Sequence, residues 1–403
     1  MSVDSATPTR PRRIRGAGLW SLASAAVVVF AAGCSGSDDA SSSSSSSVSS
    51  SAGSSSTAAD RAGGAGGPAG QTFTAVDLNT DGASAGGANT AAVVQVTNAF
   101  LTTLDDTTRD SVEYDFTDTK ARVTWSNYPQ MTVPREGVKL SDLSAAQQQA
   151  ALAILPVALS SQGATQNDDI RKADDYLNSL GGEGSDGFGA LNDYSIAIYG
   201  VPSDTEPFAV QFGGHHLARN LTYNGDKVSQ TPQFVGSEPT SFQVDGATVQ
   251  PVKAEADAMF GVLSGLTADQ RTKAEITSGT FDDLVMGPGH DDGQFPASEG
   301  LLVSELDDAQ KAQVLTAIRA YAGDLATGAA TKLLAQYQSE LDQTRVGWSN
   351  NTGPTDENSY IRIDGPSVWI EFINTRSKST PDIHYHSVYR DKNNDYGSSN
   401  LSS

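Results

Sequence analysis

The stretch YSIAIYGVPSDTEPFAVQFGGHHLARN, from Tyr194 to Asn220, holds two short apolar runs separated by turn residues. The first run, Ser195–Tyr199, alternates along its length and is followed by a glycine and a proline. Alternation with a period of two, bounded by glycine and proline, is typical of a β-strand that ends in a turn. The second run leads through two glycines to a pair of adjacent histidines. The stretch therefore predicts antiparallel strands that carry His215 and His216.

Several blocks of the first half recur in the second half, in the same order and at similar spacing. EGVKLSDLSAAQQQAAL (136–152) resembles EGLLVSELDDAQKAQVL (299–315), and HHLARN (215–220) resembles HYHSVYRD (384–391). Helix-capping patterns recur by physics alone, but unrelated caps have no reason to keep their order and spacing. These blocks predict a tandem duplication.

The predicted fold is α+β, built from two repeats at 89–246 and 247–403 that together form one globular unit. In each repeat, helices with apolar residues at helical spacing precede strands, which favours antiparallel sheet. We expect helices at 91–104 and 144–159 in the first repeat, and at 254–264 and 307–325 in the second. Pseudo-two-fold packing of the two repeats is the natural expectation for such a duplication.

The amino terminus has the features of an export signal. Four arginines precede a short apolar run, Gly18–Ala32, that ends shortly before the only cysteine of the chain, Cys34. A run of this length with small residues before a cysteine is typical of a lipoprotein signal peptide rather than a membrane span. We therefore predict a signal peptide at 1–33, lipidation of Cys34 and a flexible Ser/Gly/Ala-rich tether at 34–88. The expected location is the cell envelope, outside the cytoplasm, with the membrane as a partner through the lipid.

The charge of the chain argues against one class of partner. The formal net charge is −22 at pH 7, and an acidic surface repels the phosphate backbone, so no nucleic-acid partner is expected. The chain lacks the sequence signatures of nucleophilic hydrolases, nucleotide-binding loops and HExxH metalloproteases. The histidines are the remaining candidates for chemistry.

Four of the five histidines occur in two pairs. His384 and His386 lie in a run rich in β-branched and aromatic residues, and on a strand they would point to the same face and converge. Adjacent residues of a strand point to opposite faces, so only one of His215 and His216 can join a shared site unless the preceding glycines make a bulge or bend. The arrangement favours a metal site in which His216 meets the second pair. Candidate additional ligands are Glu238, Asp391 and Asp395, and Zn, Fe or Cu would accept such a set.

The residues alone leave two other interpretations of the histidines open, namely acid/base groups in a metal-free cleft and hydrogen-bonded structural side chains. Arg219 and Arg390 follow the two histidine pairs, and each either binds an anionic group of a substrate or holds an aspartate of the same domain. The fifth histidine, His290, lies in the segment Gly287–Phe295, which has the composition of a surface loop.

The segments FGGHHLARNLTYNGDKVSQTPQFVGSEP (212–239), WSNNTGPTDENSYIRIDGPSVWIEF (348–372) and HYHSVYRDKNNDYG (384–397) resemble a mainly bacterial family, domain of unknown function 3500. The resemblance runs from about Ala91 to the carboxyl terminus. It implies an exported protein with a G-H-H segment and a later H-x-H-x-x-x-R-D segment, and it supplies no reaction.

Taken together, the sequence predicts an extracytoplasmic lipoprotein with a histidine-cluster site. If the site is catalytic, metal-activated water or an oxidative counterpart would act on an unidentified small molecule or polymer. The alternative is a non-catalytic lipoprotein that binds a metal or ligand in the cell envelope.

Overall fold

The computed structural model describes residues 73, 77–78, 85–181, 187–377, 382–398 and 401–402. All of these residues lie within one compact unit, residues 56–403. The predicted signal peptide, Cys34 and most of the predicted tether lie outside the described residues. Within the described residues, no helix combines the length and the apolar character that a membrane crossing requires.

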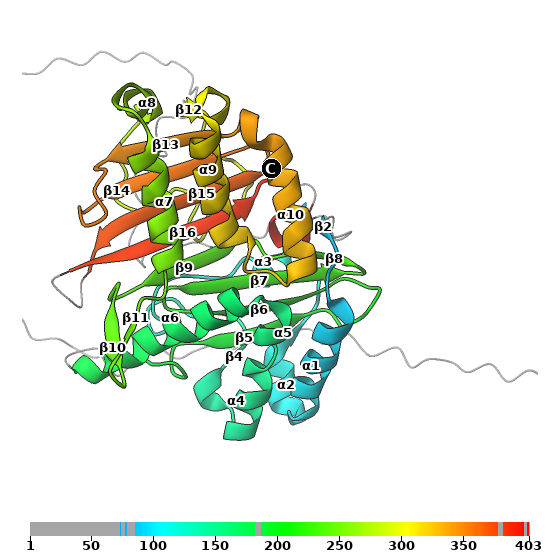
Figure 1. The fold of residues 1–403 in the computed structure, drawn as a ribbon. Helices are drawn as coiled ribbons and strands as arrows, with labels where there is room; N and C mark the ends of the chain where they lie inside the picture. The colour runs from blue at the N-terminus through cyan, green and yellow to red at the C-terminus, as the bar shows by residue number, and fades with distance from the viewer. Residues whose placement is uncertain are drawn as a thin grey trace, which may run out of the picture. The chain divides into compact units, whose positions relative to one another are not determined.

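The described residues combine helices with a large, mostly antiparallel sheet, which confirms the predicted α+β class (Figure 1). The helices are α1 (Thr90–Thr102), α2 (Asp106–Val112), α3 (Thr119–Arg122), α4 (Ala145–Leu152), α5 (Leu155–Ala158), α6 (Ser161–Leu180), α7 (Lys253–Gly265), α8 (Ala268–Ala274), α9 (Asp308–Ala322) and α10 (Thr327–Glu340).

Ten segments form the main path of the sheet. In spatial order they are β12 (Leu301–Leu302), β13 (Arg345–Asn350), β14 (Ser359–Asp364), β15 (Val368–Arg376), β16 (Ile383–Asp391), β9 (Gln233–Ser237), β7 (Leu217–Asn224), β6 (Phe208–Gly214), β5 (Ser195–Tyr199) and β3 (Glu113–Tyr114). Off this path, β4 (Val138–Lys139) pairs with β5, and β2 (Ala85–Gly86) reaches β7 through β8 (Lys227–Ser229). Among the named strands of the described residues, β3 alone pairs in parallel, with β5.

Smaller pairs complete the strands of the described residues. They are the hairpin of β10 (Phe242–Val244) with β11 (Ala247–Val249) and the pair of β1 (Asp77–Leu78) with β17 (Leu401–Ser402).

The expected leading helices are present as α1 and α7, and the capping patterns form as the sequence predicts. Ser144 and Asp307 each accept the backbone N–H three residues later, and the glutamine there bonds back to the cap. The helix expected over 144–159 is instead two helices, because Pro156 lacks a backbone N–H and begins a new turn, α5. Helix α6, which is rich in polar residues and carries Asp174, was not among the helices expected from the sequence.

The two faces of the sheet differ. Figure 1 shows α6, α7, α9 and α10 lying across one face, here called the helix face. Segments without regular structure cover part of the opposite face, here called the loop face. Trp125 from one such segment and Phe281, Leu284 and Met286 from another pack there against strand residues, including Phe234 and Val388. The paired histidines of β16 point to this loop face.

Candidate metal centre

The first histidine pair forms the turn between β6 and β7. Gly214 pairs with Leu217 in the register of the hairpin, so His215 and His216 are its two turn residues. His216, the second turn residue, has φ 58°, a left-handed conformation of the kind that a type II turn requires at this position. The two glycines before the histidines form no bulge, the condition that the sequence left open, since both remain paired in the ladder. Residues of a turn do not alternate between the two faces of a sheet as strand residues do. The rings of His215 and His216 can therefore lie side by side, and their centroids are 3.8 Å apart.

Two glycines leave the space that this turn needs. A Cβ at Gly214 would lie 2.4 Å from the ring of Tyr194 and 2.5 Å from the carbonyl oxygen of Asp193. A Cβ at Gly236, on the neighbouring strand β9, would lie 3.0 Å from Cδ2 of His216. Side chains at these positions would therefore displace the hairpin or the His216 ring.

Hydrogen bonds to the backbone hold the turn on both sides. The His215 N–H donates to Asp193 Oδ2 at 2.6 Å, and the Tyr194 hydroxyl donates to the His215 carbonyl at 3.0 Å. The His216 N–H donates to the Asn127 carbonyl at 3.0 Å, while Gly236 N–H donates to the His216 carbonyl at 2.8 Å. Satisfied backbone groups fix the direction in which the two imidazoles leave the chain.

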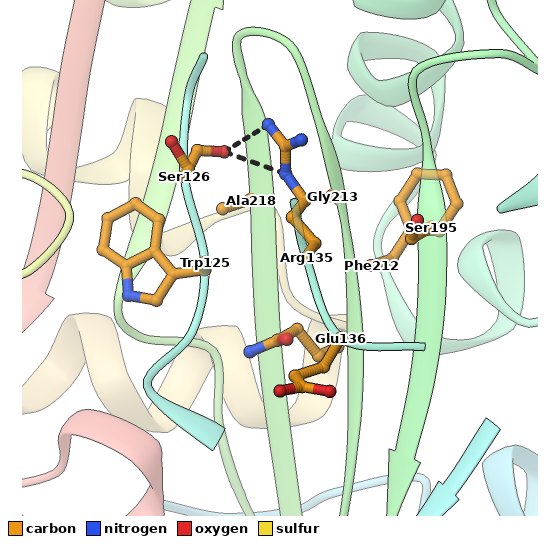
Figure 2. Close-up of a pocket in the computed structure, with 9 residues that line it drawn as sticks. Trp125, Ser126, Arg135, Glu136, Ser195, Phe212, Gly213 and Ala218 are labelled. Atoms are coloured by element: carbon orange, nitrogen blue, oxygen red, sulfur yellow. Dashed lines mark hydrogen bonds between the residues drawn. The ribbon is translucent and has the colours of Figure 1, made fainter. Parts of the chain in front are cut away.

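The segment that includes Asn127 is itself held by Arg135. The guanidinium donates to the Ser126 carbonyl at 2.8 Å, as Figure 2 shows, and also to the Tyr128 carbonyl. A cavity of about 10 Å³ lies here, lined by Arg135, Trp125 and residues of β5, β6 and β7, and it has room for about one water molecule. Nothing in the sequence links Arg135 to the histidine hairpin, so this support could not be predicted.

The second histidine pair behaves as the strand period predicts. His384 and His386 lie on one face of β16, and their Nε2 atoms are 3.0 Å apart. The Nε2 atom of His216 lies 3.1 Å from that of His386. The three residues form a set whose ligand atoms all lie within 4.8 Å of one another. The predicted meeting of His216 with the second pair is therefore present.

The separations match those of ligands on a single ion. Two nitrogens that each lie about 2.05 Å from a tetrahedral metal ion are about 3.3 Å apart. The observed 3.0 and 3.1 Å are within a few tenths of an ångström of that separation. The three side chains are buried, with exposed fractions of 3% for His216, 7% for His384 and 5% for His386.

A carboxylate orients one of the three rings from behind. Nδ1 of His386 lies 2.8 Å from Asp283 Oδ1, and that oxygen also accepts the N–H of Leu284. A proton on Nδ1 leaves the Nε2 lone pair directed at the other imidazoles, as metal-bound histidines require. The sequence analysis did not identify Asp283, because the segment of irregular structure that carries it has no motif and is far from the histidines in sequence.

A second set shares His216 and contains His215 and Glu238, whose ligand atoms also lie within 4.8 Å of one another. Nδ1 of His215 is 2.8 Å from Asp174 Oδ1, and its Nε2 is 3.8 Å from Glu238 Oε2. Glu238 is a candidate from sequence, whereas Asp174 comes from α6 and was missed. Asp174 lies on a helix that the sequence did not predict.

Electrostatics separates the histidines into two kinds. Burial lowers the pKa of His216 well below its ordinary value, and the neighbouring imidazoles add to the effect. Burial likewise lowers the pKa of His384 to about 3, with His386 as the second cause. Both rings are neutral near pH 7, the state that binds metals. For His215, burial also opposes the charged form, but Asp174 outweighs it and raises the pKa.

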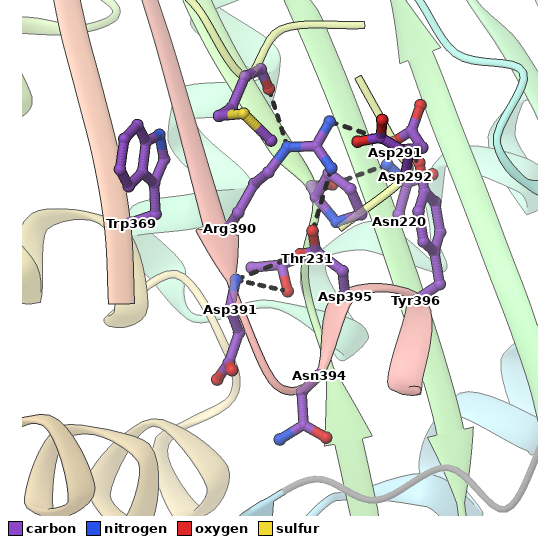
Figure 3. A network of polar contacts seen from close by, with 12 residues as sticks. Asn220, Thr231, Asp291, Asp292, Trp369, Arg390, Asp391, Asn394, Asp395 and Tyr396 are labelled. Carbon is purple, nitrogen blue, oxygen red and sulfur yellow. Dashed lines mark hydrogen bonds and ion pairs between the residues drawn. The ribbon is translucent and has the colours of Figure 1, made fainter. Parts of the chain in front are cut away.

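The two candidate arginines lie on opposite faces of the sheet and hold carboxylates of the same domain. Arg219 reaches the helix face, where it bonds to Asp324 at 2.7 Å and to two side chains of α6. Arg390 reaches the loop face and bonds to Asp291 and Asp395, each at 3.0 Å (Figure 3). Both are at most 1% exposed, so they have the structural role that the sequence left as one of two options.

The remaining candidates belong to these networks rather than to the histidine sets. Asp395 is a partner of Arg390, and Asp391 points away from Arg390 and accepts the Tyr337 hydroxyl at 2.9 Å (Figure 3). Asp291, next to the fifth histidine, is 4% exposed and holds Arg390. The segment expected as a surface loop therefore also packs against the sheet.

Comparison with known proteins supplies a family but no activity. No curated protein and no solved structure matches the chain. The family model described as "Protein of unknown function (DUF3500)" matches residues 86–398, which cover the sheet, the helices on its face and both histidine pairs. The chain therefore belongs to the DUF3500 family of proteins of unknown function.

Proposed function

We propose that the protein binds one divalent transition-metal ion through His216, His384 and His386. The observation that carries this proposal is the convergence of three buried Nε2 atoms at 3.0 and 3.1 Å. Two of these rings have lowered pKa values and the third is oriented by a carboxylate, as metal ligands require. Zn, Fe and Cu all accept three imidazoles, and the ligand set does not select among them.

Three protein ligands leave a coordination position for water or substrate, the arrangement of catalytic rather than structural zinc sites. A metal held in this way lowers the pKa of a bound water and polarises a substrate oxygen. We therefore place the protein among metal-dependent enzymes, hydrolytic or oxidative, that act on a small molecule or a polymer. In this role Asp283 holds the proton on His386 Nδ1.

Burial of the site favours a second candidate, a non-catalytic protein that binds a metal in the cell envelope. None of the four paired histidines lines the cavity of Figure 2, the surface hollow between α6 and α7, or the one between α9 and α10. An enzyme needs a route for substrate to the ion, whereas a metal-holding protein needs none.

Metal content tests the proposal. Wild-type protein expressed with Zn²⁺, Fe²⁺ or Cu²⁺ supplied should contain bound metal by mass spectrometry, and the His384→Ala/His386→Ala variant should contain at least one ion per chain fewer. The matched control is His290→Ala, which removes the fifth histidine and should keep the wild-type content. Metal-free wild-type protein after each of these expressions would refute the proposal.

Binding of a small anion separates the two candidates. Protein loaded with Co²⁺ should change its visible spectrum on addition of azide if a coordination position is accessible, as an enzyme requires. A spectrum that does not respond would favour the non-catalytic candidate.

We further propose that the protein is an extracytoplasmic lipoprotein anchored through Cys34. The arginine-rich start, the apolar run and the lone cysteine support this location. Labelling of cells with a fatty-acid analogue should mark the wild-type protein and leave Cys34→Ser unmarked. Equal labelling of both proteins would contradict the anchor.

The tandem duplication also stays a proposal, with support from the blocks 136–152 and 299–315. In these blocks β4 and β12 pair antiparallel with β5 and β13, and a capped helix follows each of them. Gly137 and Gly300, each just before one of these two strands, have φ of 89° and 99°. An experimental structure would test the duplication, since the two blocks should superpose.

A further inference from the structure

His215 and Glu238 lie beside the three-histidine set but outside it. His215 Nε2 and Glu238 Oε2 face each other at 3.8 Å, with exposed fractions of 4% and 5% for the two residues. That separation is too long for a hydrogen bond. Two ligand atoms bound to one ion, each about 2.0–2.2 Å from it, lie up to about 4.2 Å apart. The gap therefore has the width that an ion between the two side chains requires.

A carboxylate orients the His215 ring in the same way as the His386 ring. Asp174 lies 2.8 Å from His215 Nδ1, just as Asp283 lies 2.8 Å from His386 Nδ1. In both cases a carboxylate behind the ring holds Nδ1 and leaves Nε2 facing the other candidate ligands. Carboxylate-oriented histidines of this kind are typical of metal ligands, and here each of the two sets contains one.

His216 connects the two sets. It is a member of both, and its Nε2 faces His386. A neutral imidazole has one nitrogen with a free lone pair, so His216 can serve two neighbouring metal positions only as an imidazolate, whose ring proton is released to solvent when the metals bind. The turn conformation of His216 and the close approach of the His215 ring bring the sets together in one buried cluster.

We propose that His215 and Glu238, together with His216, form a second metal position next to the first, so that the protein holds a pair of divalent transition-metal ions. The inference rests on the proposed function because His216 belongs to both positions. Two metals held side by side stabilise the attacking and leaving oxygens of a displacement at once. The second position therefore directs the proposal toward hydrolysis of an ester, amide or phosphoester bond.

The competing arrangement needs no second metal. A protonated His215 between Asp174 and Glu238 would also place one cation among buried carboxylates. The two arrangements differ in metal content, because the protonated ring cannot bind an ion through Nε2. Metal counting on the whole chain therefore decides between them.

The experiment measures Zn²⁺ per chain by mass spectrometry after dialysis of the full-length protein against excess Zn²⁺. We expect about two ions in wild type and in the control His290→Ala, and about one in His215→Ala and in Glu238→Gln. The conservative Glu238→Gln keeps an acceptor at Oε1 for Ser377, so it guards against misfolding of the alanine variant. Circular dichroism of each variant checks the fold.

The second metal position and the proposed function fail in different ways. One ion in wild type, unchanged in both variants, would overturn the second position and leave the first intact. Two ions retained in both variants would overturn the assignment to His215 and Glu238. No ion in wild type would overturn both proposals. Electron paramagnetic resonance of the Cu²⁺-loaded protein is an independent test. Two neighbouring Cu²⁺ ions should weaken the signal per copper in wild type, and Glu238→Gln should restore the signal.

Discussion

Asp283 shows at the scale of single residues how the site is tuned from outside its ligand set. Its carboxylate is 18% exposed and lies 2.8 Å from His386 Nδ1. His386 in turn lowers the pKa of Asp283 against the effect of burial, so the carboxylate stays charged. A charged partner makes the imidazole a stronger ligand and fixes its orientation.

Asp283→Asn should therefore weaken metal binding without abolishing it. The amide keeps the shape of the side chain but removes the charge, and losses of roughly 10- to 100-fold in affinity are typical for such outer partners. Competition with a chelator of known affinity measures the change. The neighbouring Asp282→Asn is the matched control, because Asp282 is exposed. Equal affinities of the two variants would show that Asp283 has no such role.

His384 makes a prediction about pH. Its pKa is about 3 in the folded protein, against about 6.5 in an unfolded chain. Between these values only the unfolded chain takes up the proton, so the free energy of unfolding should fall as the pH falls, by about 1 kcal/mol per pH unit. In the non-titrating variant His384→Gln this contribution is absent.

Urea unfolding of the metal-free proteins at pH 6, 5 and 4 tests this. The stability of wild type should approach that of His384→Gln, or fall below it, as the pH decreases. Other buried groups titrate in both proteins and cancel in the difference. A constant difference between the two proteins across this range would contradict a neutral, buried His384.

At the scale of elements, a buried glutamate on β15 holds the segment that carries Asp283. Glu371 is fully buried and accepts four hydrogen bonds. The donors are the N–H groups of Val285 and Met286 at 2.6 and 2.8 Å, Tyr360 Oη at 2.9 Å and Trp369 Nε1 at 2.7 Å. Two of these donors lie just after Asp283, so Glu371 fixes the position from which Asp283 reaches His386.

Glu371→Gln should loosen this segment. The NH₂ group of the glutamine would face N–H or O–H donors that now bond to the carboxylate. Loss of a buried, hydrogen-bonded charge lowers the free energy of unfolding by roughly 2–4 kcal/mol. We expect lower stability in urea together with weaker metal binding, because Asp283 is no longer held. The control Glu357→Gln changes a 39% exposed glutamate that pairs with Arg376. Reduced stability with unchanged metal affinity would show that the segment keeps its place without Glu371.

The sequence predicted those elements whose signals are local. Capping residues predicted the starts of α4 and α9, and the period of two predicted that His384 and His386 share a face of β16. It did not predict α6, in whose buried face polar side chains such as Asn167 and Asp174 interrupt the short apolar stripe. The turn at His215 also escaped prediction, because its conformation depends on partners distant in sequence, such as Asn127.

At the scale of the whole molecule, the proposed metal centre lies where the two halves of the chain meet. Strand β9 of the first half pairs with β16 of the second, with Gly236 opposite His386. His216 comes from the first half and His384 and His386 from the second, so neither half contains the full ligand set. Binding of a metal should therefore stabilise the junction between the halves as well as the site.

The same junction holds a buried carboxyl group on the helix face. Glu255 of α7 is fully buried and accepts a hydrogen bond from Gln166 of α6 at 2.6 Å, while its Oε2 has no hydrogen-bond partner. Burial raises the pKa of Glu255 to about 8, and the nearby Asp324 adds to the effect. The folded protein therefore keeps this proton at pH values where the unfolded chain has lost it.

This difference fixes the sign of a pH effect on the whole fold. Between pH 4.5 and 8 the folded state binds one more proton at Glu255 than the unfolded state, so the free energy of unfolding falls as the pH rises, by about 1 kcal/mol per pH unit. Glu255→Gln does not titrate and keeps the acceptor for Gln166. Its stability relative to wild type should therefore increase steadily from pH 5 to pH 8 in urea unfolding of the metal-free proteins. Asp257→Asn, on the same helix but 65% exposed, should run parallel to wild type. If the stability of Glu255→Gln also runs parallel to that of wild type across this pH range, the pKa of Glu255 is not raised. The junction of the halves would then tolerate a buried charge.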